Sequence, residues 1–191
     1  LDYSVLWEEH NHYFTPASLQ LTLHNLGWST VSLEQIESGG EQILVALTKP
    51  ADKGLSPVTK SNLEKEIGQA TIFGSKFSGV RTRTRQRLNE ERSRRSQLIL
   101  FGANHGASTF LDLFGHQGLF DVCIDHSVGK AGRYISRWGV PIRGPHTMPI
   151  EDDALIVSAI HPGRTEEAEE VLLCHIGKPV SIARVTDLVT E

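Results

Sequence analysis

Two hydrophobic periods alternate along the second half of the chain. Short apolar runs are separated by amphipathic stretches in which apolar residues recur three and four positions apart. The runs are typical of buried strands and the amphipathic stretches of helices. We expect strands at Leu98–Phe101, 120–124, 154–159 and 180–183, with helices at 107–114 and Thr165–Ile176. This order favours right-handed βαβ units on a parallel sheet, and therefore an α/β domain.

The first 50 residues follow a different pattern. Thr15 followed by Pro16 is a strong helix start, because threonine caps a helix and proline fits its first turn. Leucines then recur at helical spacing until Gly27. Residues 28–35 and 42–47 read as strands and flank a turn of serine and glycine, which predicts an antiparallel hairpin.

A long helix is expected to connect the two halves. Residues 49–57 are rich in proline, glycine and lysine, which favours a linker, and residues 58–95 are mostly helical in pattern. Glycines at Gly68, Gly74 and Gly79 predict breaks within that helix. The expected organisation is an N-terminal helix-plus-hairpin region (1–50), a linker and connecting helix (51–96) and a Rossmann-like domain (97–191).

Composition narrows the class of protein without changing this picture. The chain has 191 residues, of which 39% are hydrophobic, as in a globular protein. Its apolar runs are too short for a membrane span, and the acids near its start do not fit a signal peptide. Cys123 and Cys174 sit in apolar patterns, so we expect two buried free thiols and a reducing, cytoplasmic location. The first residue is not methionine, which suggests a fragment of a longer chain.

The net charge of −4 hides a basic segment at residues 76–95. It contains eight lysine and arginine residues but only two acids, Glu90 and Glu91. Such a stripe can bind nucleic acid, which leaves an RNA-associated domain as one hypothesis. No aromatic residue is interleaved with the arginines, which favours a solvated helix face, and we expect no nucleic-acid partner.

A glycine turn follows the first expected strand of the second half. Gly102 ends the apolar run, and Gly106 stands where a helix is expected to begin. Free N–H groups at such a helix end can hold a phosphate, although turns of this kind also use glycine for geometry alone. The spacing is not that of a standard NAD site. Asp125 follows the next expected strand, where an acid can accept from a ribose hydroxyl or cap a turn.

Two further loops carry candidate chemistry. In the first, Lys130 and Arg133 lie between glycines and supply donors for an anion, unless the loop is simply exposed and basic. In the second, His161 begins a His-Pro-Gly segment after an expected strand, which is typical of a lid over a ligand. Both loops follow strand ends, where ligands of α/β sheets bind.

The start of the chain holds a cluster of acids and histidines. A histidine in this segment is a natural general base because imidazole titrates near neutral pH, and a neighbouring carboxylate can orient its ring. His10 and His12 are not at the spacing of a helical metal site, so no metal is expected. The alternative interpretation is a set of exposed polar residues before a helix.

These segments, in this order, resemble the C-terminal region of the sugar C-methyltransferases, S-adenosylmethionine-dependent enzymes that methylate keto-sugars carried on a nucleoside diphosphate. The residues that carry the resemblance are Trp7-Glu8-Glu9-His10-Asn11-His12-Tyr13-Phe14, Phe101-Gly102-Ala103-Asn104-His105-Gly106-Ala107-Ser108, Asp125-His126-Ser127-Val128-Gly129-Lys130-Ala131-Gly132-Arg133-Tyr134 and Val140-Pro141-Ile142. Trp7, Glu8 and His105 stand where the family has tyrosine, histidine and lysine.

The resemblance implies that His10 is the base that removes the proton beside the sugar ketone, with Glu9 supporting it. It implies that the nucleotide-sugar is held by Gly102, Asn104, His105, Gly106, Asp125, Lys130, Arg133 and Tyr134. S-adenosylmethionine would bind to an upstream domain of the parent chain, so this chain alone would bind no cofactor and would be inactive. The alternative is a Rossmann-like module that binds a nucleotide or nucleotide-sugar without catalysis.

Overall fold

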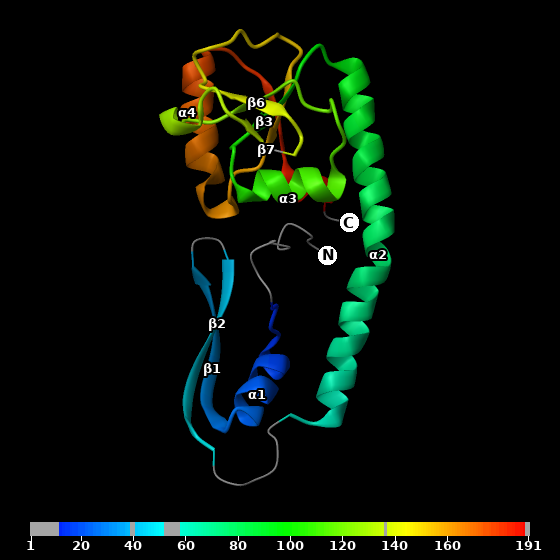
Figure 1. Cartoon of the computed structure of the whole chain (residues 1–191), viewed down its shortest axis with the longest axis vertical. Helices are drawn as coiled ribbons and strands as arrows, with labels where there is room; N and C mark the ends of the chain where they lie inside the picture. Colours follow the sequence, from blue (N-terminus) through cyan, green and yellow to red (C-terminus); the bar gives the residue numbers. More distant parts are fainter. Residues whose placement is uncertain (1–11, 39–40, 52–57, 136, 190–191) are drawn as a thin grey trace. The chain divides into compact units, whose positions relative to one another are not determined.

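The computed structural model describes residues 12–38, 41–51, 58–135 and 137–189 (Figure 1). Within the chain, residues 10–76 group into one compact unit and residues 77–191 into another. The division falls inside one long helix, α2 (Lys60–Arg94). The proposed base His10 and its partner Glu9 lie outside the described residues, so their roles stay predictions.

The first unit contains the expected helix and hairpin. Helix α1 (Pro16–Asn25) begins at Thr15, whose hydroxyl accepts from the Ser18 backbone while the Ser18 hydroxyl accepts from the Thr15 backbone. Strands β1 (Trp28–Ser38) and β2 (Glu41–Pro50) pair in antiparallel fashion. The linker expected at 49–57 was placed too early, because β2 continues through Pro50; residues 52–57 lie outside the described range.

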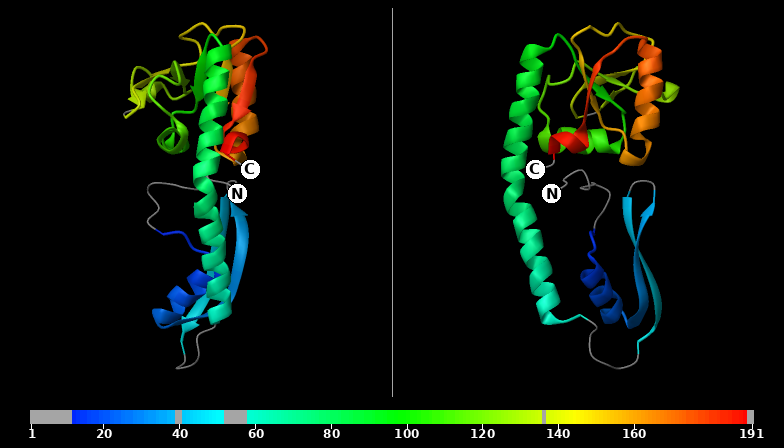
Figure 2. Two further views of the ribbon diagram at one scale, coloured as in Figure 1. Left: turned by 90° about the vertical axis from the view of Figure 1, so that its right-hand side faces the viewer. Right: turned by 180° about the vertical axis from the view of Figure 1, so that it is seen from behind.

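Helix α2 is continuous, so the breaks expected at Gly68, Gly74 and Gly79 are wrong. The segment contains no proline, and the good helix formers around each glycine offset the roughly 1 kcal/mol that a glycine costs. Its buried residues, which lie four positions apart on the C-terminal half, are Val80, Thr84 and Leu88. This half runs along the second unit in every view (Figures 1 and 2).

The second unit is built on a six-stranded sheet in the order β5-β6-β4-β3-β7-β8. The strands are β3 (Leu98–Phe101), β4 (Val122–Ile124), β5 (Tyr134–Ile135), β6 (Val140–Arg143), β7 (Leu155–Ser158) and β8 (Ser181–Arg184). The helical segments are α3 (His105–Phe114), η1 (Val128–Lys130), η2 (Pro162–Arg164), α4 (Thr165–Ile176) and α5 (Val185–Val189). The pairs β6-β4, β4-β3, β3-β7 and β7-β8 are parallel, whereas β5 is antiparallel to β6. The expected α/β, Rossmann-like fold is therefore confirmed.

The core of this unit lies around the three central strands, whose residues are all buried. Leu172 of α4 packs against them on one face. Both cysteines are free, but the expectation that both are buried is wrong for Cys174, which lies on an exposed part of α4. Cys123 of β4 is buried, and this burial raises the pKa of its thiol to about 12.

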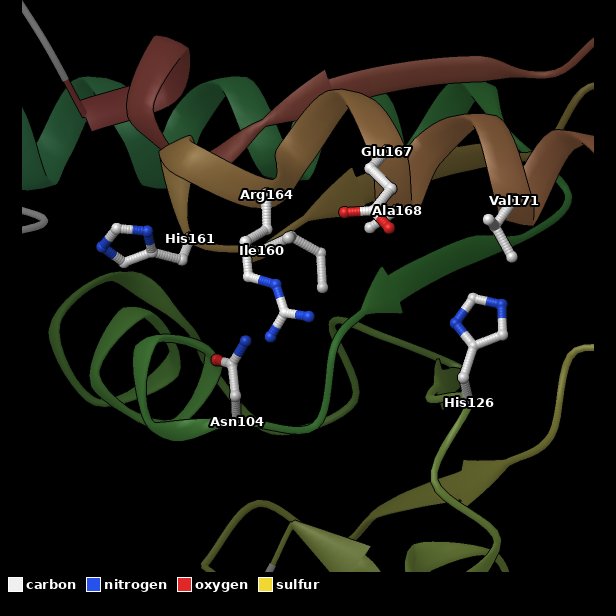
Figure 3. Close-up of a pocket in the computed structure, with 8 residues that line it drawn as sticks. All are labelled: Asn104, His126, Ile160, His161, Arg164, Glu167, Ala168 and Val171. Carbon is white, nitrogen blue, oxygen red and sulfur yellow. The ribbon is translucent and has the colours of Figure 1, made fainter. Parts of the chain in front are cut away.

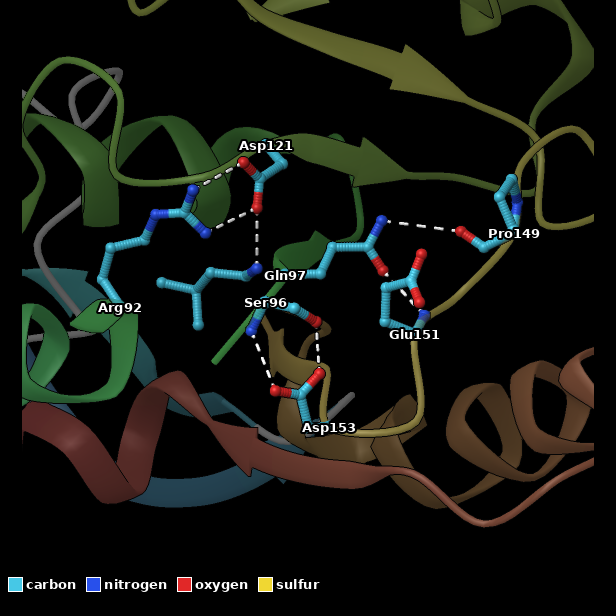
Figure 4. Close-up of polar contacts among 8 residues, drawn as sticks. Arg92, Ser96, Gln97, Asp121, Pro149, Glu151 and Asp153 are labelled. Carbon is cyan, nitrogen blue, oxygen red and sulfur yellow. Dashed lines mark hydrogen bonds and ion pairs between the residues drawn. The ribbon is translucent and has the colours of Figure 1, made fainter. Parts of the chain in front are cut away.

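Polar side chains fix the amino end of β3 (Figure 4). The Asp121 carboxylate accepts from the Arg92 guanidinium at 2.8 and 2.9 Å and from the Leu98 backbone N–H at 2.8 Å. Asp153 accepts from the backbone and the hydroxyl of Ser96, and the hydroxyl is the main reason that the pKa of Asp153 is lowered. These bonds anchor the amino end of β3 and thereby help to position its carboxyl end, since the strand is only four residues long.

Several arginines of the basic segment on α2 bond to other groups of the protein. The Arg85 guanidinium donates to the backbone oxygens of Phe114 and Gly115, at the end of α3, at 3.2 and 3.0 Å. Arg92 bonds Asp121, and Arg95 bonds Glu91. The contacts of Arg85 and Arg92 tie α2 to the rest of the sheet unit, whereas the Arg95 pair is local to the end of the helix. They support the expectation of a structural helix, while nucleic-acid binding stays untested.

Candidate functional site

The sheet has a point at which the chain connections diverge. From β3 the chain passes through α3 to β4 on one side, whereas β7, on the other side of β3, is followed by α4 and β8. The carboxyl ends of β3 and β7 therefore lie next to each other, with the first residues of α3 and α4 beside them. In open α/β sheets, ligands bind in the crevice at such a point.

A pocket of about 320 Å³ occupies this edge (Figure 3). Its size is at the lower end of the range for small-molecule sites. Its walls come from the turns after β3, β4 and β7 and from the first half of α4. The lining residues are Asn104, His126, Ile160, His161, Arg164, Glu167, Ala168 and Val171.

The glycine turn after β3 is held by its own side-chain contacts. Gly102 has a φ of +94°, and a Cβ there would lie 2.7 Å from Cδ1 of Ile160. The Asn104 amide oxygen accepts from the Ala107 N–H at 2.9 Å, which caps α3, and its nitrogen donates to the Ala159 oxygen at 2.9 Å. Asn104 thus joins the ends of β3 and β7. A Cβ on Gly106 would lie 3.3 Å from the capping oxygen of Asn104, so this position is also tight.

Asp125 has the turn-capping role that the sequence left open. Its carboxylate accepts from the Ala103 N–H at 2.8 Å, from the Ser127 N–H at 2.8 Å and from the Lys130 ammonium at 3.1 Å. The side chain is 11% exposed. The charge of Lys130 is therefore partly compensated within the protein, and a ligand contact of either residue stays a prediction.

The other predicted substrate residues are spread around this edge. His105 is half-buried at the start of α3, Arg133 is exposed, and Tyr134 on β5 is 60% exposed. Neither Arg133 nor Tyr134 lines the pocket, whereas Asn104 does. His161, from the predicted lid, also lines it, but the residues after it form the short helical turn η2.

Three histidines that are distant in sequence meet beside the pocket. The ring of His175, in the last turn of α4, lies 5.3 Å from that of His126 and 4.4 Å from that of His146, measured between centroids. His126 also packs edge-on against Phe101 at 5.7 Å. Loss of solvent is the main cause that lowers the pKa of His126, followed by the charge of His175, while Asp125 acts in the opposite direction. No local sequence pattern could have predicted this cluster.

Arg164 and Glu167 are lining residues that sequence reasoning missed. Both stand at the start of α4 and project into the pocket (Figure 3). Ligands of α/β sheets bind beside the carboxyl ends of strands, and this rule pointed to Gly102 and His161. Arg164 lies in the same turn as His161, three residues later, so the rule could have pointed to it as well.

The described part of the chain contains neither a metal-binding cluster of side chains nor a membrane-spanning helix. Over residues 12–38, 41–51, 58–135 and 137–189, no group of three or more histidine, cysteine, aspartate or glutamate side chains is arranged to hold a metal ion. None of the helices there has the length and apolar character that a membrane span requires.

The described residues form an α/β domain with a pocket at the diverging strands. The sequence model of one family, the C-methyltransferase C-terminal domain, matches residues 45–159, which is more than half of the chain. The chain therefore belongs to the C-methyltransferase C-terminal domain family. The match includes α2, the glycine turn and the loop from Asp125 to Tyr134, and it ends before Arg164. No curated protein matches the chain.

Proposed function

We propose that this chain supplies substrate binding and a general base to an S-adenosylmethionine-dependent C-methyltransferase that acts on a nucleoside-diphosphate keto-sugar or a similar small molecule. The observation that carries the proposal is a pocket at the diverging strands of a domain that belongs to a C-methyltransferase family. A methyltransferase needs a site for its acceptor, and the pocket has the size and place of such a site.

The glycine turn and the pocket would hold the substrate. The positive φ of Gly102 brings backbone close to the ligand side without a side chain in the way. The first N–H groups of α3, at His105 and Gly106, point toward the carboxyl edge, where a phosphate is stabilised by hydrogen bonds and by the helix dipole. Asp125, Lys130, Arg133 and Tyr134 would border the same ligand from the neighbouring loop.

The chemistry assigned to His10 follows from the reaction class. Methylation at carbon requires that a proton leave the carbon beside the ketone, so that an enolate forms. The His10 imidazole would take this proton, and Glu9 would hold the ring and stabilise its cation. S-adenosylmethionine would supply the methyl group from an upstream domain, and we assign none of the described residues to it.

A binding module without catalysis is the second candidate. The pocket is built from residues between Asn104 and Val171 and does not need His10. A domain of this kind could retain its ligand while another part of the parent protein performs a different reaction.

Substrate binding can be tested on the chain itself. Thermal unfolding is measured with a panel of nucleoside diphosphates and their sugars. A ligand at about 100 times its dissociation constant adds roughly 2.7 kcal/mol of stability, which is an easily measured shift. If no member of the panel stabilises the chain, the proposed substrate class is wrong.

The base is tested in the parent enzyme, which carries the cofactor domain. Deuterium exchange at the substrate carbon is followed without methyl donor, for the parent enzyme, for His10→Ala and for the matched variant His12→Ala. Loss of a general base typically lowers the rate by about 10²–10⁴-fold, and we expect this for His10→Ala alone. Exchange retained in His10→Ala but lost in His12→Ala would assign the role to His12. Binding without exchange in the unmodified enzyme would favour the binding module.

A further inference from the structure

Several arginine side chains of the sheet unit bond to other groups of the protein, whereas that of Arg164 has no such bond among the described residues. Arg85, Arg92 and Arg184 bond backbone oxygens, Asp121 and Glu169 respectively. Within the described ranges, the Arg164 guanidinium has neither a hydrogen-bond nor an ion-pair partner, although Glu167 stands one helical turn away. Its side chain extends into the pocket between Asn104 and Ile160 (Figure 3).

The turn that carries Arg164 is held firmly. The Thr165 hydroxyl donates to the backbone oxygens of Ile160 and His161 at 3.2 and 2.9 Å, and Thr165 is buried. The Arg164 N–H donates to the His161 oxygen at 2.9 Å, and the Gly163 N–H donates to Nδ1 of His161 at 3.3 Å. These bonds fix the backbone from which the Arg164 side chain extends, so only the side chain has to become ordered when a ligand binds.

The remaining walls limit the chemistry of a ligand. Ile160, Ala168 and Val171 give the pocket an apolar side, and the imidazole of His126 lies opposite Val171 (Figure 3). Glu167 supplies a carboxylate that can accept hydrogen bonds. A ligand that satisfies both charged groups carries an anion for the arginine and a hydroxyl or N–H donor for the glutamate.

We infer that this pocket binds a phosphate-bearing, hydroxylated small molecule, with Arg164 as the direct phosphate contact and Glu167 as an acceptor for a ligand hydroxyl. A planar guanidinium matches two phosphate oxygens at once, which a lysine cannot do. The inference deepens the proposed function and rests on it for the identity of the substrate. It adds a charged phosphate contact at the start of α4 to the N–H groups of α3 named in the proposed function, whereas the charge of Lys130 is already paired with Asp125.

The test uses the whole chain with two probes, inorganic pyrophosphate and uridine diphosphate, in calorimetric titrations at low salt. The variants are Arg164→Gln, Arg164→Lys and the control Arg87→Gln, which removes an exposed arginine on α2. We expect Arg164→Gln to weaken the binding of both probes by about tenfold or more, because a hydrogen-bonded charge contact is lost. Arg164→Lys should fall between, and Arg87→Gln should stay within about twofold of the unmodified chain.

The outcomes separate the inference from the proposed function. If Arg164→Gln binds both probes within about twofold of the unmodified chain, or if neither probe binds, the inference is overturned. If the probes depend on Arg164 but no nucleotide-sugar stabilises the chain or undergoes exchange in the parent enzyme, the proposed function fails while the phosphate site stands. Backbone NMR shifts on probe addition should centre on residues 160–171; shifts confined to the loop after β4 would also overturn the inference.

Discussion

The two ends of β3 use their polar side chains differently. At the amino end, Asp121 bonds Arg92 and the Leu98 backbone, so these two charged groups have partners within the protein. At the carboxyl end, Asn104 and Asp125 also bond backbone groups, yet Arg164 projects into a pocket without such a partner among the described residues. A polar residue near a strand end is therefore not by itself a sign of function, because Asp121, Asn104 and Asp125 all bond the backbone. The useful sign is a charged group on a rigid turn that the fold does not use.

Asp121→Ala should give the largest loss of stability. It removes the acceptor of a bidentate arginine and leaves the Leu98 N–H without its partner, which should cost about 2–3 kcal/mol of unfolding free energy. The matched control is Asp152→Ala, whose side chain is 96% exposed and pairs with Lys178, and which should cost less than about 0.5 kcal/mol. Urea unfolding measures both, and equal losses would contradict a structural role for the amino end.

Gly102→Ala should cost about 1–2 kcal/mol, because alanine is strained at a positive φ. The added Cβ also lies 2.7 Å from Ile160, so this pocket residue must move. Gly118→Ala is the control, since its φ is +76° and a Cβ there meets nothing within 4 Å. Both variants should lose stability in urea unfolding, but Gly102→Ala alone should also weaken ligand binding. Equal ligand affinity in the two variants would show that Ile160 does not shape the site.

The histidine cluster predicts a smaller, pH-dependent effect. Folding lowers the pKa of His126 from its usual 6.5, chiefly by removing solvent, so the unfolded chain binds this proton more readily than the folded chain. The stability associated with neutral His126 is therefore present above about pH 6.5 and is lost as the pH falls toward the folded value. Urea unfolding between about pH 8 and pH 5 should show this loss.

His126→Gln should remove that part of the pH dependence, whereas His175→Gln should reduce it, because only the second cause of the lowered pKa disappears. His146 and Asp125 also act on His126 and stay in place in both variants. An unchanged pH profile in His126→Gln would show that other groups produce it.

Arg164→Gln should give the smallest change in stability, within about 0.5 kcal/mol, because no described residue loses a partner. Its unfolding curve in urea is compared with that of Asp121→Ala. A loss as large as that of Asp121→Ala would remove the contrast between the two ends of β3 and would make Arg164 a structural residue.

Local patterns in the sequence were sufficient for most of the fold. β3 and α4 lie where the expected Leu98–Phe101 strand and Thr165–Ile176 helix were placed, because apolar runs and amphipathic spacing are local properties. The antiparallel hairpin was also predicted. β5 and α5 were not, since a two-residue strand depends on β6 and a five-residue helix is docked through the bond from Thr84 to Leu188.

The site was predicted less completely. Gly102 was recognised because a glycine at a strand end has a local conformational reason, and its positive φ agrees with that reason. The contact of His126 with His175 and the placement of Arg164 in the pocket depend on how α4 packs on the sheet. Such contacts join residues that no sequence window contains. The base His10 lies outside the described residues and stays a prediction.

The central place of β3 also has a consequence for biosynthesis. It is the first strand of its sheet to leave the ribosome, but its partner β7 follows about 55 residues later, which takes roughly 3–11 s at the usual rate of translation. During this time one edge of the apolar Leu98–Phe101 strand has no neighbour from its own sheet, and unpaired apolar edges are templates for aggregation. A ribosome that stalls between β4 and β7 would therefore leave one edge of this buried apolar strand exposed to the cell.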